Sequence, residues 1–466
     1  MAHDDTRHFL AAPLRTKQTI SNGAAAAAGG AGLPQLDISR CVPPTALGPL
    51  SSSDTLAPLE VQSGLSVRVD RTRVIGTGQY STVCMGMLEL PLPGGRAQRE
   101  ACAIKIPHAN NLDARELGLI EAAALWQAGS APQTVRCYGL VNLKAIDGPK
   151  GVCEVGLWPE VAAQAISGDG EWALVLEYCE GGVCWSWMTE HRLRMDAELF
   201  FVWARQLATA LVALKAAGMA HMDIKGHNML LTRDGQIRLA DFTAASFSAQ
   251  AIEAMQQQCP GFDPLAYPPY MDFSGTIPYS APEALAPGAY SKQHGNDELH
   301  KMDIYALGVS LYTMFVGGRE PYATVKSAVE QMLLASKGAF WEWEERHYLA
   351  TLQSAAETAP STPVDVRTAF IDVGYAHTPP PSSPIEPKHP LSRSLSLGPK
   401  PLTRRRTLKS RKAAPREFRR FLSGDLLPVN IESLLCSMVN PDPLKRPDAA
   451  EVLRVLDTIE SDIFEP

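Results

Sequence analysis

The sequence predicts an α+β protein of two lobes, a small β-rich lobe over 66–178 and a larger, mainly helical lobe over 179–460. Three observations predict this fold class. Short segments with strand character fill the first lobe, long segments with helical periodicity fill the second, and low-complexity stretches lie outside both. The hydrophobic content of 45% and the charged content of 20% are ordinary for a globular protein, so a sizeable core can form.

The strands of the first lobe are recognised by alternation and by short apolar runs. The segment SVRVDRTRVIGTG alternates and predicts a strand, ACAIKI predicts a second, and WALVLEY predicts a buried third. Between them LDARELGLIEAAALWQA has helical periodicity, with Asp113 near its start. In the second lobe DAELFFVWARQLATALVALKAAG predicts a long helix ending at Gly218. Helical pattern returns in IESLLCSMV and AAEVLRVLDTI.

Two segments have the composition of disordered chain. Residues 1–65 contain NGAAAAAGGAG and SSSD, and residues 352–415 form an insert in the second lobe that is rich in Pro, Ser and basic residues. The basic run RRRTLKSRKAAPREFRR fits nuclear localisation or contact with an anionic surface, and it fits a solvated linker as well. Thr362, Thr378 and Ser383 precede prolines and are candidate phosphorylation sites.

Charge and apolar runs do not indicate a nucleic-acid partner or a membrane span. The net charge is −7, and the longest apolar stretch, 199–217, carries Arg205 and Lys215, which favours a core helix. Nine scattered cysteines without zinc-site spacing, and an N-terminus without a signal pattern, favour a reducing compartment. We expect a cytoplasmic protein, with the nucleus as the alternative, and the sequence leaves the oligomeric state open.

The segment IGTGQYSTV (75–83) is a glycine-containing turn between two strands. Gly76 and Gly78 would let backbone N–H groups approach phosphate oxygens, whereas an ordinary hairpin explains the same residues. Ser81 occupies the third glycine position of G-x-G-x-x-G. A turn between two strands, rather than between a strand and a helix, disfavours dinucleotide binding.

Lys105 lies inside the apolar strand ACAIKI. A buried lysine needs a partner, and Glu121 on the following helix is the natural counter-ion, with Glu116 as a substitute. The functional interpretation is a lysine held by a carboxylate so that it can bind nucleotide phosphates. The alternative is an edge-strand lysine that reaches solvent.

The stretch AHMDIKGHNMLL contains a carboxylate, an ammonium and an amide at fixed offsets. Asp223 can accept a proton from a hydroxyl, Lys225 can neutralise charge on a phosphate, and the Asn228 amide oxygen can bind a divalent cation. In IRLADFTAAS, Asp241 follows an apolar strand and could hold magnesium together with Asn228. Each residue alone could be a turn residue, but the spaced set is harder to obtain by chance.

Together these stretches resemble the eukaryotic protein kinase family. The segments GTGQYSTV, CAIK, HMDIKGHN and DFT come in the order and approximate spacing of that family. The segments GTIPYSAPE, DIYALG and NPDPLKRP resemble the end of the activation loop, the helix start that braces the catalytic loop, and a late motif whose Arg446 pairs with Glu283. The resemblance covers roughly 66–460 apart from the insert.

The resemblance implies a bilobal protein-kinase-like fold that binds ATP and Mg²⁺ between its lobes and transfers the γ-phosphate to protein hydroxyls. Lys105, held by Glu121, would contact the α- and β-phosphates. Leu176 would be the gatekeeper. The remaining nucleotide-binding positions implied are Gly76, Gly78 and Ser81 over the phosphates, Val83 and Ala103 on adenine, and Glu177 and Cys179 as hinge backbone groups.

The resemblance also assigns the reacting end of the site. Asp223 would be the catalytic base, Lys225 would contact the γ-phosphate, and Asn228 and Asp241 would hold magnesium. Lysine two residues after the aspartate, and Thr276 in GTIPY, follow the pattern of serine/threonine kinases. The implied partner is therefore a protein substrate with a Ser or Thr acceptor.

Two residues depart from the family pattern. Met222 replaces the arginine that commonly binds an activation-loop phosphate, so we expect activity that does not require such a phosphate. Thr243 replaces the glycine of the metal motif, which is either a tolerated substitution or a damaged metal site. The alternatives are a pseudokinase that acts as a binding scaffold and a small-molecule phosphotransferase.

Overall fold

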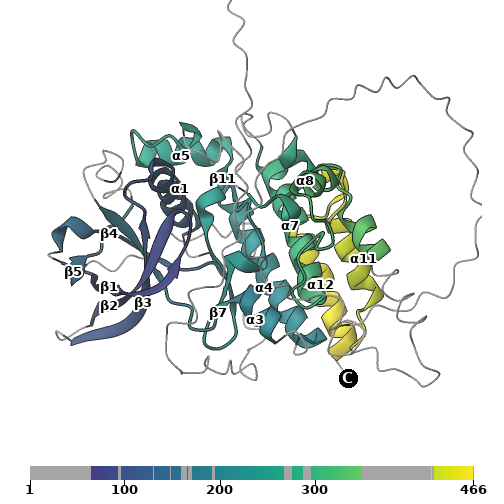
Figure 1. Cartoon of the computed structure of the whole chain (residues 1–466), viewed down its shortest axis with the longest axis horizontal. Coiled ribbons are helices and arrows are strands. Elements are labelled where there is room, and N and C mark those ends of the chain that lie inside the picture. Colours follow the sequence, from purple (N-terminus) through teal and green to yellow (C-terminus); the bar gives the residue numbers. More distant parts are fainter. Residues whose placement is uncertain are drawn as a thin grey trace, which may run out of the picture.

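The fold consists of a β-rich lobe and a helical lobe, as predicted (Figure 1). A computed structural model describes residues 64–92, 96–129, 131–146, 148–158, 165, 171–191, 195–266, 275–286, 295–347, 421 and 425–464. The predicted N-terminal segment up to residue 63 and the predicted insert 352–415 lie outside these ranges. Leu65 belongs to the folded lobe, because it is buried and its carbonyl accepts a hydrogen bond from the Val155 amide.

The β-rich lobe is built on a six-stranded antiparallel sheet in the order β4-β6-β3-β2-β1-β5. The predicted strands are confirmed. Their side chains alternate between the two faces of the sheet, and the apolar face forms a cluster that includes Val67, Leu88, Ile104 and Val175. The strands are β1 (Ser66–Thr77), β2 (Ser81–Leu92), β3 (Arg96–Pro107), β4 (Cys137–Asn142), β5 (Lys150–Glu154) and β6 (Trp172–Glu177).

Strand β5 was not predicted, and it changes the shape of the sheet. It pairs with the outer edge of β1 over five residues. Directly after it, Gly156 exchanges two backbone hydrogen bonds of 2.8 Å with Leu140 of β4, the strand at the other end of the order. The sheet therefore curls until its two end strands are joined.

Helix α1 (Leu112–Ala128) has the bounds that its periodicity predicts. Asn111 caps it by accepting a hydrogen bond from the Ala114 amide. The helix lies close against the sheet at Gly118, where a Cβ atom would come within 2.8 Å of the Trp172 ring and 3.0 Å of Pro107. This close approach brings the next turn of the helix, with Glu121, over Lys105 of β3.

The helical lobe is organised around two long buried helices, α4 (Ala197–Ala216) and α7 (Asn296–Phe315). Asp196 caps α4, and Gly218 takes a left-handed φ of +70° just after its end. The other elements of this lobe are α3 (Cys184–Glu190), α5 (Ala249–Gln258), α8 (Ala328–Ser336), α11 (Val429–Met438), α12 (Ala449–Phe464), β7 (Gly182–Val183), β8 (Met219–Ala220), β9 (Met229–Leu231), β10 (Ile237–Leu239) and β11 (Ser246–Phe247).

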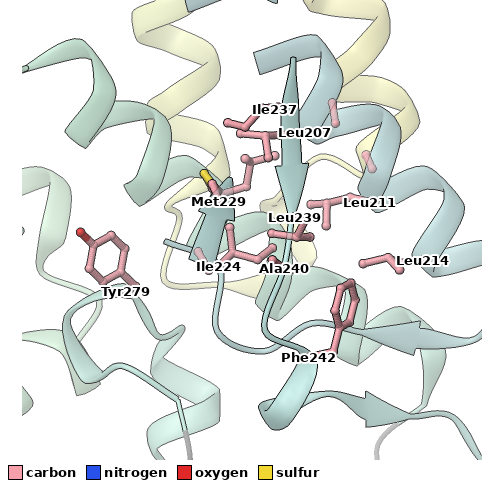
Figure 2. Packing of buried hydrophobic residues seen from close by; sticks show 14 of the residues in the cluster. Leu207, Leu211, Leu214, Ile224, Met229, Ile237, Leu239, Ala240, Phe242 and Tyr279 are labelled. Carbon is pink, nitrogen blue, oxygen red and sulfur yellow. The ribbon is translucent and has the colours of Figure 1, made fainter. Parts of the chain in front are cut away.

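The core of this lobe holds the hairpin that carries the predicted catalytic residues. Figure 2 shows Leu207, Leu211 and Leu214 of α4 facing Met229 of β9 and Leu239 of β10. Strands β9 and β10 pair in antiparallel register, which brings the chain before β9 next to the chain after β10. The stretches around residues 223–228 and 241 are thereby fixed on one buried platform.

Helix α4 is also the one described helix that is long and apolar enough to cross a membrane by length and composition. Within its apolar window 78% is buried inside the protein. That burial favours the predicted core helix, because the apolar surface is already covered by the rest of the lobe.

Helix α5 lies in the segment between residues 241 and 283, where no helix is predicted from the sequence. Ser248 caps it by accepting a hydrogen bond from the Ala251 amide, and Ala251, Ile252 and Met255 form its buried face. It lies beside α1 (Figure 1), and the indole N–H of Trp126 in α1 donates to the Gln258 side chain at 3.1 Å. The segment thus reaches back to the β-rich lobe.

Candidate active site

Lys105 joins three elements that are far apart in the sequence. Its Nζ lies 2.6 Å from Glu121 Oε2 in α1 and 3.1 Å from Asp241 Oδ1, just after β10. The predicted pairing with Glu121 is confirmed. Burial alone would lower the pKa of Lys105, but the charges of Asp241 and Glu121 outweigh it and raise this pKa, so the lysine is a cation.

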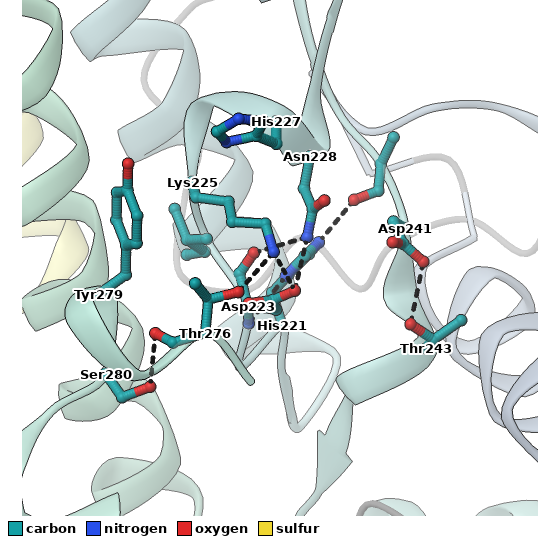
Figure 3. Close-up of polar contacts among 12 residues, drawn as sticks. His221, Asp223, Lys225, His227, Asn228, Asp241, Thr243, Thr276, Tyr279 and Ser280 are labelled. Carbon is teal, nitrogen blue, oxygen red and sulfur yellow. Dashed lines mark hydrogen bonds and ion pairs between the residues drawn. The ribbon is translucent and has the colours of Figure 1, made fainter. Parts of the chain in front are cut away.

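The loop between β8 and β9 brings two of the predicted side chains to the carboxylate of a third, Asp223 (Figure 3). Asp223 Oδ2 accepts a hydrogen bond from Lys225 Nζ at 2.9 Å and one from Asn228 Nδ2 at 2.9 Å. Lys225 Nζ also donates to the hydroxyl of Thr276, which lies 51 residues further along the chain. Lys225 therefore connects Asp223 to the segment that carries Thr276.

Asp303 of α7 fixes the backbone of this loop. Its carboxylate accepts hydrogen bonds from the amides of His221 at 2.7 Å and of Met222 at 2.9 Å. Met222 has a φ of +64°, a conformation that L-residues rarely adopt, so these bonds hold a strained turn. The half-buried Met222 side chain packs against the hydrophobic core and carries no charge that could bind an anion.

His221 links the same loop to the segment that carries Asp241. Its Nε2 lies 2.9 Å from the Ala240 carbonyl, which requires a donor, and its Nδ1 accepts from the Asp223 amide. Burial lowers the pKa of His221, which agrees with the neutral ring that this pair of bonds requires. The buried imidazole therefore sets the relative position of the two stretches without adding charge.

Asp241 projects from a backbone in the left-handed region, with φ of +62°. Burial raises the pKa of Asp241, but this effect is limited because 42% of the side chain is exposed. The charge of Lys105, together with hydrogen bonds from Lys105 and Thr243, outweighs burial and holds the pKa well below the usual range. The hydroxyl of Thr243 donates to Asp241 Oδ1 at 2.9 Å. The residue at the expected glycine position therefore contacts the carboxylate directly.

The oxygen donors at this point fit a magnesium ion shared with a nucleotide. The Asn228 amide uses its nitrogen for both Asp223 O and Asp223 Oδ2, so its oxygen is directed away from Asp223. In Figure 3 that oxygen points to the side on which Asp241 lies. An ionised carboxylate and an amide oxygen are hard ligands, and Mg²⁺ commonly takes one or two protein carboxylates together with phosphate oxygens.

The glycine turn is a hairpin between β1 and β2, as its sequence predicts. The Gly78 amide donates to the Ser81 carbonyl at 2.8 Å and closes the turn. A Cβ atom would meet nothing closer than 3.9 Å at Gly76 and 3.8 Å at Gly78, and neither residue has a positive φ. The fold itself does not require glycine here, which is consistent with a ligand that must approach the backbone closely.

His108, which the sequence analysis did not single out, anchors the tip of this hairpin. Its amide donates to the Tyr80 carbonyl at 2.9 Å, its Nδ1 lies 3.1 Å from the Gln79 carbonyl, and its Nε2 lies 3.2 Å from the Thr82 hydroxyl. A single histidine at the end of a strand carries no sequence signal for this role.

The predicted adenine-binding residues lie on adjacent strands. Val83 pairs with Lys105, and Ala103 pairs with Leu176 across β3 and β6. At the end of β6, the Glu177 amide donates to the Arg136 carbonyl, and in the segment that follows, the Cys179 carbonyl accepts a hydrogen bond from the Gly182 amide. These bonds use one backbone group of each residue, so the Glu177 carbonyl and the Cys179 amide are the groups that fit the predicted hinge contacts.

The predicted pair between Arg446 and Glu283 is confirmed as a bidentate contact. Arg446 Nη2 lies 2.8 Å from Glu283 Oε2, and Nη1 bonds to Oε1. The guanidinium also donates to the Asn440 and Lys301 carbonyls and lies 4.9 Å from the centre of the Tyr305 ring. This network anchors the segment that follows Thr276.

A second group of residues beside the loop escaped sequence reasoning. The Tyr279 hydroxyl donates to Glu320 at 2.9 Å, and the His227 ring lies 3.7 Å from the same carboxylate and stacks on Trp185 at 4.5 Å between centroids. Burial, followed by the charge of Lys225, lowers the pKa of His227 to about 4. These residues come from four separate segments, so no local pattern predicts their contact.

Comparisons with known proteins identify the family of the chain. The family model described as the protein kinase domain matches residues 69–455. The chain is 32% identical over 150 residues to the mouse (Mus musculus) hormonally up-regulated neu tumor-associated kinase, which covers 32% of this chain and 18% of that protein. It is 27% identical over 171 residues to a probable cAMP-dependent protein kinase catalytic subunit of Encephalitozoon cuniculi, which covers 37% of this chain and 45% of that protein.

A further relative is the serine/threonine-protein kinase cds1 of Schizosaccharomyces pombe, 30% identical over 172 residues, or 37% of this chain and 33% of that protein. The alignments thus span less than half the length of these relatives. The domain match, in contrast, extends through both lobes and well beyond half of the 466 residues. The chain therefore belongs to the eukaryotic protein kinase family and has its bilobal α+β fold.

Proposed function

We propose that this protein kinase uses ATP and Mg²⁺ to phosphorylate serine or threonine hydroxyls of protein substrates. The observation that carries the proposal is the three-way contact of Lys105 with Glu121 and Asp241. It joins the β-rich lobe, helix α1 and the predicted metal ligand in one arrangement. A lysine so held is a fixed cation for phosphate oxygens, which is the chief requirement of a reaction catalysed by positioning and charge stabilisation.

Different residues of the site bind the phosphates, the cation and the adenine ring. Lys105 and the backbone of the glycine hairpin bind phosphates, and Asn228 and Asp241 hold the cation through their oxygens. A bound Mg²⁺ ion would supply further neutralisation of phosphate charge. Val83 and Ala103 provide the apolar surface for the adenine ring.

Asp223 orients and accepts the proton of the substrate hydroxyl. Lys225 and Asn228 both donate to its Oδ2, which fixes the plane of the carboxylate. Lys225 lies between Asp223 and Thr276 and provides positive charge where phosphate charge develops. The contact of Lys225 with Thr276 supports Ser/Thr specificity, because both residues follow the pattern of serine/threonine kinases.

The test is phosphate transfer from labelled ATP to a degenerate peptide library with Ser, Thr or Tyr as acceptor. Wild type should label Ser and Thr peptides only in the presence of Mg²⁺. Asp223→Asn should lower the rate by about 10²–10⁴-fold, because it keeps the shape of the side chain but cannot accept the proton. Glu342→Gln, in an exposed ion pair with Arg346, is the matched control and should leave the rate unchanged.

Other outcomes separate the alternatives. Binding of nucleotide without transfer to any peptide would favour a pseudokinase scaffold. Transfer to small alcohols in preference to peptides would favour a small-molecule phosphotransferase. Labelling of Tyr peptides at the rate of Ser peptides would contradict the proposed specificity.

A further inference from the structure

Thr243 is the residue that most clearly breaks the family pattern at the metal side of the site. Its hydroxyl donates to Asp241 Oδ1 at 2.9 Å, two residues back along the chain. The same oxygen receives Lys105 Nζ at 3.1 Å. Asp241 therefore has two donors on one carboxylate oxygen, and the direction of the whole group is fixed by that oxygen.

The contact with Thr243 also determines where the second carboxylate oxygen of Asp241 points. Figure 3 shows the dashed contact from Thr243 reaching the Asp241 oxygen that points toward it, while the second oxygen is directed to the side of Asn228. That is also the side to which the Asn228 amide oxygen points. Thr243 thus holds the carboxylate in the orientation that presents its remaining oxygen together with the second proposed ligand.

The backbone explains why a threonine can occupy this position. The residue of the motif with a positive φ is Asp241, at +62°, whereas Thr243 lies in a short 3₁₀ turn over Phe242–Ala244 and has a negative φ. A β-branched residue is compatible with such a turn. The strain at Asp241 makes an additional restraint useful, because a left-handed residue followed by a tight turn has no regular helix or strand to fix its side chain.

We propose that Thr243 is a positioning residue that orients Asp241 for a divalent cation bound together with a nucleotide. This inference rests on the proposed function and deepens it at the metal side of the site. The hydroxyl replaces the flexibility expected of glycine with a fixed hydrogen bond. Thr243 does not contact the nucleotide and acts only through Asp241.

The rival explanation is a local turn in which the carboxylate merely satisfies the hydroxyl. The two explanations differ in what the loss of the hydroxyl should change. A positioning residue affects the part of nucleotide affinity that depends on the cation. A turn residue affects folding stability and leaves that part unchanged.

The experiment compares full-length wild type, Thr243→Val and Thr243→Ser by calorimetric titration with ADP, once with Mg²⁺ and once with a chelator. Valine keeps the shape and removes the hydroxyl, and serine keeps the hydroxyl. We expect valine to reduce the gain in ADP affinity caused by Mg²⁺ by about tenfold or more, the effect of losing a hydrogen bond to a charged group. Serine should retain the gain, and the affinity without Mg²⁺ should be equal in all three proteins.

Thermal unfolding of the three proteins completes the test. If valine retains the full Mg²⁺-dependent gain, or if it lowers only the unfolding temperature, the inference on Thr243 is wrong while the proposed function stands. If wild type shows neither a Mg²⁺-dependent gain nor phosphate transfer, the proposed function is wrong and the inference falls with it.

Discussion

Two buried ion pairs connect distant parts of this chain, and they differ in the number of carboxylates that the cation contacts. Arg446 and Glu283 form a closed bidentate contact, the arginine side chain is 0% exposed, and backbone carbonyls and the Tyr305 ring complete its surroundings. Lys105 and Glu121 form a contact that is also buried, but Lys105 shares its charge with a third group, Asp241, whose side chain is 42% exposed.

The difference shows how similar chemistry can serve structure in one region and function in another. The arginine has one carboxylate partner, so the loss of that charge leaves a buried cation with neutral acceptors only. The lysine has two carboxylate partners and can keep one when the other is changed. The Lys105 pair, which has a second carboxylate partner, can take part in ligand binding. The Arg446–Glu283 pair, called the sealed pair below, can only stabilise the fold.

The largest expected effect follows from changing Glu283 to Gln. The buried Arg446 charge would lose its counter-ion, so the free energy of unfolding should fall by about 3–5 kcal/mol. Urea unfolding followed by circular dichroism measures this change. The exposed pair of Glu342 and Arg346 provides the control, because Glu342→Gln should change the stability by less than about 1 kcal/mol. Equal losses of stability in Glu283→Gln and Glu342→Gln would contradict the structural role of the sealed pair.

The same chemical change at Glu121 should have the opposite profile. Lys105 keeps Asp241 as a partner in Glu121→Gln, so the unfolding free energy should fall by only about 1 kcal/mol. The rate of peptide phosphorylation should fall by about 10-fold to 100-fold, because Lys105 is no longer fixed between two carboxylates. A stability loss as large as that of Glu283→Gln would show that the two pairs do not differ.

Two histidines, His300 near the Arg446–Glu283 pair and His227 in the loop that carries Asp223, allow a comparison by pH. Burial, followed by nearby lysine charges, lowers the pKa of His300 and of His227 to about 4, against an ordinary value of 6.5. Between pH 6.5 and 4 the folded protein keeps these rings neutral while the unfolded chain binds protons, so the unfolding free energy falls as the pH decreases. The loss should be on the order of 1 kcal/mol for His300, which is 3% exposed, and smaller for His227.

Urea unfolding of His300→Gln and His227→Gln at several pH values checks this difference. The variant at His300, whose Nε2 accepts the Ala449 amide beside the sealed pair, should flatten the pH dependence more than the variant at His227. A stronger flattening at His227 would contradict the assigned burial of the two rings.

The smallest effect is expected from removing phosphate. Met222 packs against the core and cannot bind an anion, and Lys105, Glu121 and Asp241 are already in contact. Phosphatase treatment, with complete removal checked by mass spectrometry, should therefore leave the rate of peptide phosphorylation unchanged. A fall in rate would show that an activation-loop phosphate is bound elsewhere in the protein.

The sequence predicted the parts of the fold whose signals are local. The periodicity of Leu112–Ala128 and of the segment from Asp196 to Gly218 predicts helices within a residue or two of those observed. Helix α5 carries a comparable local signal, a serine cap followed by apolar residues at helical spacing, although no helix is predicted there above. Strand β5 could not be recognised, because KGVCE is short and its partner β1 lies more than 70 residues earlier.

In the site, the sequence predicts contacts between residues more reliably than it predicts the roles of the residues that depart from the family pattern. The pairing of Lys105 with Glu121 follows from the need of a lysine inside an apolar strand for a counter-ion, and that of Arg446 with Glu283 follows from the resemblance to the kinase family. The role of the Thr243 hydroxyl depends on the left-handed backbone of Asp241, a tertiary detail that no pattern of residue types reveals. The same holds for Glu320, which reaches the site only through the packing of separate loops.

The joined ends of the sheet in the β-rich lobe restrict how other proteins can recognise it. A sheet with an open edge can accept an extended peptide as an additional strand, and the same edge invites aggregation. Here β5 covers the outer edge of β1, and the two hydrogen bonds between Leu140 and Gly156 connect the opposite end. Among the described residues of this lobe, helix α1 and the surfaces of the loops are therefore the natural places for a partner to bind, and strand addition is disfavoured.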